Sequence, residues 1–186
     1  MSAEPATRPA LEPGPPGPAP LGRSFRLRDL ARLMRLKVCL LASGASLAGF
    51  ALALPGSGLR AVAAGAVPTP LAPLLFSALG AFFLAAGCSA LNQVQERRED
   101  ALMRRTADRP IPAGRLSPGR GLALALGLLG LSLGLLVLAG GRIEGWANAA
   151  CLAGIWLAVI GLYNGLYTPL KKRTPLCMLV GGLAGA

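Results

Sequence analysis

Three oxygen-bearing side chains recur at four-residue intervals in the most acidic part of the chain. Asn92, Glu96 and Asp100 stand at positions i, i+4 and i+8. If one helix carries them, they share a face, with roughly 6 Å of rise between neighbours. Mg²⁺ is a hard cation that takes one or two carboxylates, keeps water molecules and bridges to substrate phosphates. The spacing therefore predicts a magnesium site along this face.

The same segment, residues 93–119, is also rich in arginine. It holds four of the chain's eight acidic residues and the following arginines: Arg97, Arg98, Arg104, Arg105, Arg109 and Arg115. Guanidinium groups present planar donor forks that match phosphate oxygens. Acids with arginines thus indicate a metal–diphosphate site. The composition equally suits a solvated loop whose arginines set the membrane topology and form ion pairs such as that of Asp100 with Arg104.

A second polar cluster runs from Tyr163 to Thr174. Tyr167 is a candidate hydrogen-bond donor to a phosphate, and Lys171 or Lys172 would supply positive charge. An interfacial aromatic belt followed by cytoplasmic basic residues explains the segment equally well. Arg35 and Lys37 are positioned to complete a basic ring, or to extend toward lipid headgroups.

Long apolar stretches must position these residues. The chain has 186 residues, 53% of them hydrophobic and only 5% aromatic. Four apolar stretches of roughly 18 to 22 residues are long enough to cross a bilayer as helices. They lie near 38–55, 71–92, 120–140 and 146–166, and a fifth begins near Leu176. Lipid offers exposed backbone groups no partners, so the fold class is an all-α, polytopic transmembrane helix bundle.

The net charge of +11 lies in clusters between the apolar stretches, so we expect a lipid bilayer and no nucleic acid as partner. The basic clusters are the segment before the first span, residues 93–119 and residues 171–173. The 56–70 connection has only Arg60, and at 141–145 Glu144 offsets Arg142. This alternation predicts a multi-pass inner-membrane protein of bacterial type with a cytoplasmic N-terminus.

Residues 1–22 are rich in Pro, Ala and Gly and are expected to be a disordered cytoplasmic tail, which leaves 23–186 as one membrane domain. The four cysteines lack zinc-site spacing, and the chain has no histidine, so they are expected in the apolar core. Gly161 and Gly165 form a GxxxG pair, which predicts a helix-packing face.

The stretch from Asn92 to Ser117, NQVQERREDALMRRTADRPIPAGRLS, resembles the first motif of UbiA-type intramembrane prenyltransferases. It is most similar to the haem branch, the protoheme IX farnesyltransferases. That motif reads approximately N-x-x-x-D-R-D-x-D-x-x-M-x-R-T-x-x-R-P-x-x-x-G-x-[IV]-S, and this sequence keeps its register without a gap. Two further stretches are similar to the family, Leu33 to Val38 and Tyr167 to Ala186, so that the resemblance covers roughly residues 30 to 186.

The resemblance implies a bundle of nine spans around a central cavity, of which these residues would form the N-terminal part. It implies Mg²⁺-dependent transfer of farnesyl from farnesyl diphosphate to the vinyl group of protoheme IX, which makes haem O. Asn92, Glu96 and Asp100 would bind the metal. Tyr167 and Lys172 would act at the leaving group. The remaining diphosphate contacts would come from Arg35 or Lys37, Arg105, Arg109, Arg115 and Lys171.

The sequence departs from the family pattern at three positions. Glu96 replaces the usual aspartate, Arg98 stands where the haem branch has aspartate, and Leu36 replaces a proline before the first span. Glu96 keeps the negative charge on a longer side chain, whereas Arg98 weakens the assignment to the haem branch.

The family's second aspartate-rich motif is not among these 186 residues. We therefore expect the N-terminal half of a longer enzyme, or a truncated reading frame, without transfer activity alone. Two alternatives remain open at the level of sequence. One is a prenyltransferase for a quinone or another aromatic acceptor, and the other is a non-catalytic membrane remnant.

Overall fold

The computed structural model describes residues 26–53, 71–143, 146–174 and 177–185, and the regular elements in these ranges are all helical. The helices are α1 (Leu27–Met34), α2 (Leu36–Ala53), α4 (Leu71–Gln95), α5 (Arg97–Leu102), α6 (Pro118–Ile143), α7 (Trp146–Ile160), the π-helix η1 (Gly161–Tyr167), α8 (Thr168–Leu170) and α9 (Cys177–Gly185). The predicted all-α class is confirmed. The predicted N-terminal tail lies outside the described residues.

Four stretches are long and apolar enough to span a membrane, and they match the four predicted spans. They are Leu36–Ala53, Leu71–Gln95, Pro118–Arg142 and Trp146–Leu170. A 25-residue helix is about 37 Å long, so the last three extend beyond a hydrocarbon core of about 30 Å. The chain is thus a multi-pass membrane protein.

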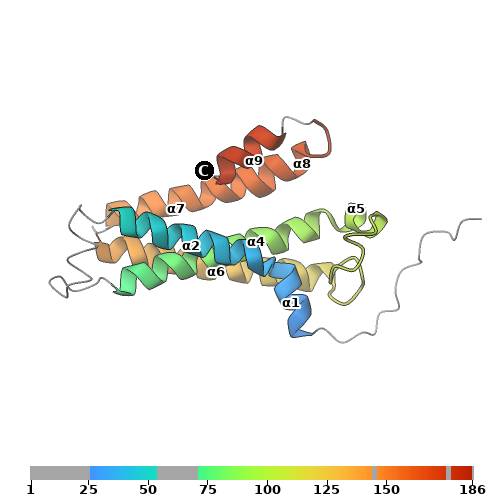
Figure 1. The fold of residues 1–186 in the computed structure, drawn as a ribbon, viewed down its shortest axis with the longest axis horizontal. Helices are drawn as coiled ribbons and strands as arrows, with labels where there is room; N and C mark the ends of the chain where they lie inside the picture. The colour runs from blue at the N-terminus through green and yellow to red at the C-terminus, as the bar shows by residue number, and fades with distance from the viewer. Residues whose placement is uncertain (1–25, 54–70, 144–145, 175–176, 186) are drawn as a thin grey trace, which may run out of the picture.

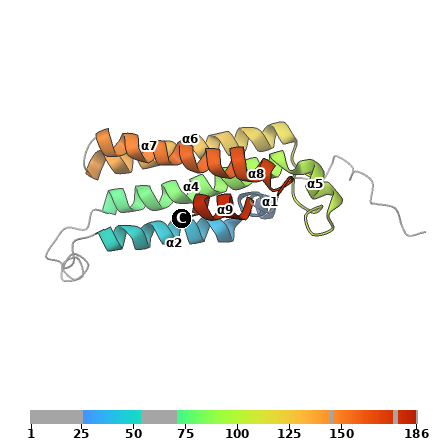
Figure 2. The same ribbon diagram turned by 90° about the horizontal axis from the view of Figure 1, so that it is seen from above.

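Helix α4 is the centre of the bundle and the most buried of the four spans. It packs on α6 and on α2, and Figures 1 and 2 show these helices running side by side. Two glycines allow the close approach of α6. A Cβ atom at Gly87 would lie 2.7 Å from Leu129 Cγ, and one at Gly80 would lie 2.7 Å from Leu136 Cγ. Small residues therefore set the α4–α6 distance.

The predicted packing face at Gly161 and Gly165 is not used in this way. Within the described part of the chain, nothing lies within 4 Å of a Cβ atom built at either glycine, beyond the local backbone. The α6–α7 hairpin instead closes at Gly140, where a Cβ atom would lie 2.9 Å from Ala149 Cα.

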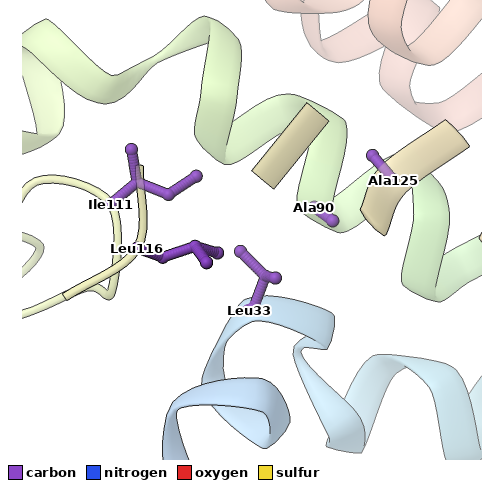
Figure 3. Packing of buried hydrophobic residues seen from close by; sticks show 5 residues of the cluster. All are labelled: Leu33, Ala90, Ile111, Leu116 and Ala125. Atoms are coloured by element: carbon purple, nitrogen blue, oxygen red, sulfur yellow. The ribbon is translucent and has the colours of Figure 1, made fainter. Parts of the chain in front are cut away.

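Helix α1 departs sharply from α2 at Arg35, whose φ of 53° lies in the left-handed region. Two interactions hold it against α4. Leu33 is fully buried in a cluster with Ala90, Ile111, Leu116 and Ala125, as Figure 3 shows. The Gln93 side chain also donates to the Arg32 and Leu33 carbonyls, at 3.1 and 2.8 Å, which satisfies free acceptors at the α1 C-terminus.

The elements that carry the predicted polar residues gather at one end of the bundle. Helices α1, α5 and α8 lie there in both ribbon views (Figures 1 and 2). The ends of α2 and α6 and the starts of α4 and α7 lie at the other end (Figure 1). The fold thus brings segments far apart in the sequence to a common surface.

Candidate functional site

A charged cleft of about 380 Å³ opens at this end of the bundle. Its lining residues are Glu96, Glu99, Asp100, Met103, Arg105, Thr106, Arg109, Lys171 and Lys172. Six of them were predicted site residues, and they come from two segments about 75 positions apart. Three carboxylates thus face four cationic side chains across one small cavity.

The metal-binding face predicted from sequence is buried at the α4–α5 junction. Asn92, Glu96 and Asp100 are 5%, 6% and 4% exposed, respectively. One unbroken helix does not carry the three residues, because α4 ends at Gln95 and α5 begins at Arg97. Two backbone hydrogen bonds nevertheless keep the four-residue spacing: Glu96 N donates to Asn92 O (2.9 Å), and Asp100 N donates to Glu96 O (2.8 Å).

Side chains from α8 and the residues after it contact the first two members of this face. Thr168 Oγ1 donates to Asn92 Oδ1 at 2.8 Å, and Asn92 Nδ2 donates to Glu96 Oε2 at 3.0 Å. Lys171 Nζ donates to the other carboxylate oxygen of Glu96 at 3.1 Å. The buried glutamate therefore has a cation beside it, which offsets the cost of burying a carboxylate.

The other two carboxylates of the cleft are paired as well. Arg109 donates to Asp100 Oδ2 at 2.5 Å, and Thr106 donates to the Asp100 backbone carbonyl at 3.0 Å. Lys172 donates to Glu99 Oε1, and this hydrogen bond lowers the pKa of Glu99. The second oxygen, Glu99 Oε2, is shielded from solvent and has no hydrogen-bond partner among the described residues.

The donor set suits Mg²⁺ in a bridging role. Among the described residues, no three His, Cys, Asp or Glu side chains converge to hold a metal ion. The carboxylates lie at successive positions along the α4–α5 junction and offer oxygen atoms alone, which are the ligands of a hard cation. Such a face fits an ion that takes one or two carboxylates and completes its shell with water and phosphate oxygens.

Three predicted diphosphate contacts do not line the cleft. Arg115 is 10% exposed, and its guanidinium is engaged by Asp29 and Asp108. Arg35 forms the sharp junction between α1 and α2, and Lys37 follows it on the exposed surface of α2. Both lie at the same end of the molecule as the cleft.

Tyr167 lies one helical turn before Lys171, at the end of the π-helix. Its ring stacks on Tyr163, with centroids 5.5 Å apart, and a Cβ atom at Gly181 of α9 would lie 3.0 Å from Tyr167 Cε2. Tyr163 also lines an apolar cavity of about 390 Å³ between α2, α4, α7 and α9. The cavity contains Cys88 and Ser89, one turn of α4 before Asn92.

Several polar residues that join the elements of the site had no role assigned from the sequence. Asn164 is 3% exposed; its side chain donates to the Cys88 carbonyl (3.1 Å), and Gln95 donates to its backbone carbonyl (3.1 Å). Thr168 connects η1 and α8 to Asn92. An amide inside an otherwise apolar span was the available signal, because such groups need partners in a membrane.

The chain is similar in sequence to one known family of proteins. Residues 38–186 match the UbiA prenyltransferase family. Proteins named protoheme IX farnesyltransferase are 41% identical over 160 residues in Nitratidesulfovibrio vulgaris and 47% identical over 133 residues in Geobacter sulfurreducens. The first alignment covers 86% of this chain and 48% of the relative, and the second covers 70% and 46%.

A third relative of the same name, from Ectopseudomonas mendocina, is 40% identical over 159 residues, which are 86% of this chain and 47% of that protein. The chain spans about half the length of the curated relatives that it matches. No solved structure is significantly similar to it. The extent of the family match shows that the chain belongs to the UbiA prenyltransferase family.

Proposed function

We propose that the charged cleft binds farnesyl diphosphate together with Mg²⁺, and that the chain serves the transfer of the farnesyl group to protoheme IX, which makes haem O. One observation carries this proposal: three carboxylates and four cations from distant segments line a single cleft. The names of the relatives support the choice of prenyl donor and haem acceptor.

Asn92, Glu96 and Asp100 would hold the metal ion. When bound, Mg²⁺ would supply positive charge that stabilises the departing diphosphate. Lys171 and Arg109, which now donate to Glu96 and Asp100, would turn toward the phosphate oxygens. The carboxylates would then pair with the metal ion, and the Lys171 and Arg109 side chains would pair with the phosphate oxygens. No charged group in the cleft would be left unpaired.

Lys172 and Arg105 would extend the phosphate contacts on the exposed side of the cleft. Lys172 is 42% exposed and pairs with Glu99, so its ammonium group has room to move toward a ligand. Tyr167 would donate a hydrogen bond near the leaving group. We keep Arg35 or Lys37 as outer phosphate contacts, on the strength of their position at this end of the bundle.

The apolar cavity between α2, α4, α7 and α9 would receive the isoprenoid chain. Its walls are small aliphatic side chains of α2 and α4, together with Tyr163. A lining of this kind excludes water, which would otherwise capture the allylic cation left when the diphosphate departs. Cys88 in the wall of this cavity lies about two helical turns before Glu96 of the cleft, so headgroup and tail would have separate environments.

A binding experiment tests the donor site. The purified chain in nanodiscs would be titrated with farnesyl diphosphate by calorimetry, with Mg²⁺ and with EDTA. Wild type should bind only with Mg²⁺, and Asp100→Asn or Glu96→Gln should weaken binding by about 100-fold, since each removes a metal ligand charge. Arg142→Gln, at the opposite end of the bundle, is the control. Equal binding by Asp100→Asn and wild type would contradict the site.

The acceptor is tested separately by adding protoheme IX to the same samples. We expect a saturable shift of the Soret band that strengthens when Mg²⁺ and a non-reactive farnesyl diphosphate analogue are present. The chain has no histidine, so the spectrum should show no imidazole-ligated iron. Saturable binding of an aromatic quinone precursor, with no Soret shift, would assign a different acceptor.

A further inference from the structure

Arg115 is held by carboxylate and carbonyl groups on both sides of its guanidinium. Its Nε donates to Asp29 Oδ1 at 2.9 Å, one terminal nitrogen donates to Asp108 Oδ1 at 3.0 Å, and the other donates to the Asp108 carbonyl at 2.6 Å. All three nitrogens therefore have acceptors within the protein. A guanidinium committed in this way has no free fork for a phosphate.

Asp29 belongs to the framework of α1. It is 5% exposed, and its second oxygen accepts a hydrogen bond from the Arg26 backbone at 3.1 Å, which caps the start of the helix. If Arg115 turned to a diphosphate, Asp29 would remain buried without a cation, which is strongly unfavourable.

Arg115 also lies near the end of residues 103–117, the segment that contributes Arg105 and Arg109 to the cleft. Its backbone N–H donates to the Pro110 carbonyl at 2.9 Å, and the turn before it needs Gly114 at a φ of 71°. Pro110 directly follows Arg109, which pairs with Asp100 in the cleft. In the same segment, Ile111 and Leu116 pack on Leu33 of α1 (Figure 3). The ion pair and this apolar cluster thus fix one segment on one helix.

We propose that Arg115 is a positioning residue: together with Asp29 and Asp108 it clamps residues 103–117 onto α1, and so sets the position of Arg105 and Arg109 in the cleft without contacting the diphosphate itself. We call Asp29, Asp108 and Arg115 the clamp. The proposal rests on the proposed function in so far as it takes the cleft to be the diphosphate site.

A double-mutant cycle separates positioning from direct contact. Affinity for farnesyl diphosphate with Mg²⁺ would be measured for Asp29→Asn, Arg115→Gln and the double variant. A clamp predicts that each single variant binds about tenfold more weakly, and that the double variant is within about twofold of the singles, because the two changes break one interaction. Arg120→Gln, an exposed residue of α6, is the control and should bind as wild type does.

A direct phosphate contact predicts the opposite pattern. Asp29→Asn would then free the guanidinium and leave binding unchanged or tighter, while Arg115→Gln alone would weaken it. That result would overturn the clamp. Asp29→Glu keeps the charge and should restore much of the affinity, which distinguishes a lost ion pair from misfolding.

A second measurement does not depend on substrate. Spin labels at the exposed positions 28 and 104, in a background without native cysteines, would report the distance between α1 and residues 103–117 by pulsed electron paramagnetic resonance. We expect one narrow distance distribution in wild type and a broad one in Asp29→Asn and Arg115→Gln. Unchanged distributions would overturn the clamp. Failure of wild type to bind farnesyl diphosphate would instead overturn the proposed function.

Discussion

Individual charges at this site are tolerated because each has a partner beside it. Asp100 is almost fully buried and pairs with the mostly buried Arg109, whereas Glu99 and Lys172 are both about 40% exposed. Loss of a partner costs far more for a buried charge than for an exposed one. Arg109 therefore stabilises the site until another cation takes its place beside Asp100, whereas Lys172 can change partners at little cost.

Asp108 gives the clamp a defined pH dependence. Hydrogen bonds from Arg32 and then Arg115 lower the pKa of Asp108 below its ordinary value near 4. A lowered pKa means that the folded state prefers the carboxylate. The stabilisation is therefore fully present above the ordinary pKa and is lost as the pH falls through the lower, folded value.

We predict that Asp108→Asn destabilises the protein at pH 7, and that the difference from wild type begins to shrink at about pH 4 and disappears as the pH falls through the lower, folded pKa of Asp108. The melting temperatures of both proteins in detergent between pH 7 and pH 3 would check this. A difference that stays constant over this range would show that the carboxylate charge is not involved.

Residue types and spacing predicted much of the site, but not the long-range pairs. Glu96, Asp100, Arg105, Arg109, Lys171 and Lys172 line the cleft as a group. Arg115 was expected beside the phosphate, because guanidinium groups match phosphate oxygens and the family resemblance implies this contact. Its partner Asp29 lies 86 positions earlier, and local periodicity carries no information about such a contact.

The helices pack through glycines that sequence motifs did not single out. Gly161 and Gly165 fit the GxxxG pattern, yet the close contacts occur at Gly80, Gly87 and Gly140. The GxxxG pattern shows that one helix face lacks bulky side chains, whereas the tertiary arrangement decides whether that face packs against another helix. A glycine-rich chain offers many such faces, so sequence alone does not choose between them.

We predict that Gly140→Ala destabilises the protein by about 1–3 kcal/mol, because the new methyl group would lie against the Ala149 backbone and push α6 and α7 apart. Gly127→Ala is the matched control in the same helix, since nothing lies within 4 Å of its Cβ position. It should stabilise the helix by about 0.5–1 kcal/mol. Equal effects in reversible unfolding would contradict close packing at Gly140.

The π-helix was not predicted either. The Thr168 backbone N–H bonds to the Tyr163 carbonyl, five residues earlier, in place of the usual four. A wide turn of this kind shifts the register of the residues that follow it, and such turns are frequent at functional sites. Here it precedes Thr168 and Lys171, which contact Asn92 and Glu96 of the proposed metal-binding face.

At the scale of the whole molecule, hydropathy predicted the four spans, whose length and composition determine membrane insertion. Hydropathy did not predict which helices pack together, because apolar helices of similar composition have the same hydropathy. The positive-inside rule adds an orientation: α1, the cleft and Lys171–Arg173 would face the cytoplasm.

We predict that cysteines placed at Arg104 and at Arg142 react with membrane-impermeant maleimides from opposite sides. In a background without native cysteines, position 104 should be labelled in inverted inner-membrane vesicles and position 142 in right-side-out vesicles. Arg142 lies over the Phe76 ring at the end of the bundle away from the cleft. Labelling of both positions from one side would refute the proposed topology.

We propose that the Asn92–Glu96–Asp100 face and a prenyl diphosphate bind the same divalent ion. Electron–nuclear double resonance would test this with Mn²⁺ and farnesyl diphosphate bound to protein labelled with ¹³C at the aspartate carboxylates. We predict that the Mn²⁺ signal couples to both ³¹P and ¹³C, and that Asp100→Asn removes the ¹³C coupling. A ³¹P coupling without any ¹³C coupling in the wild type would contradict the account.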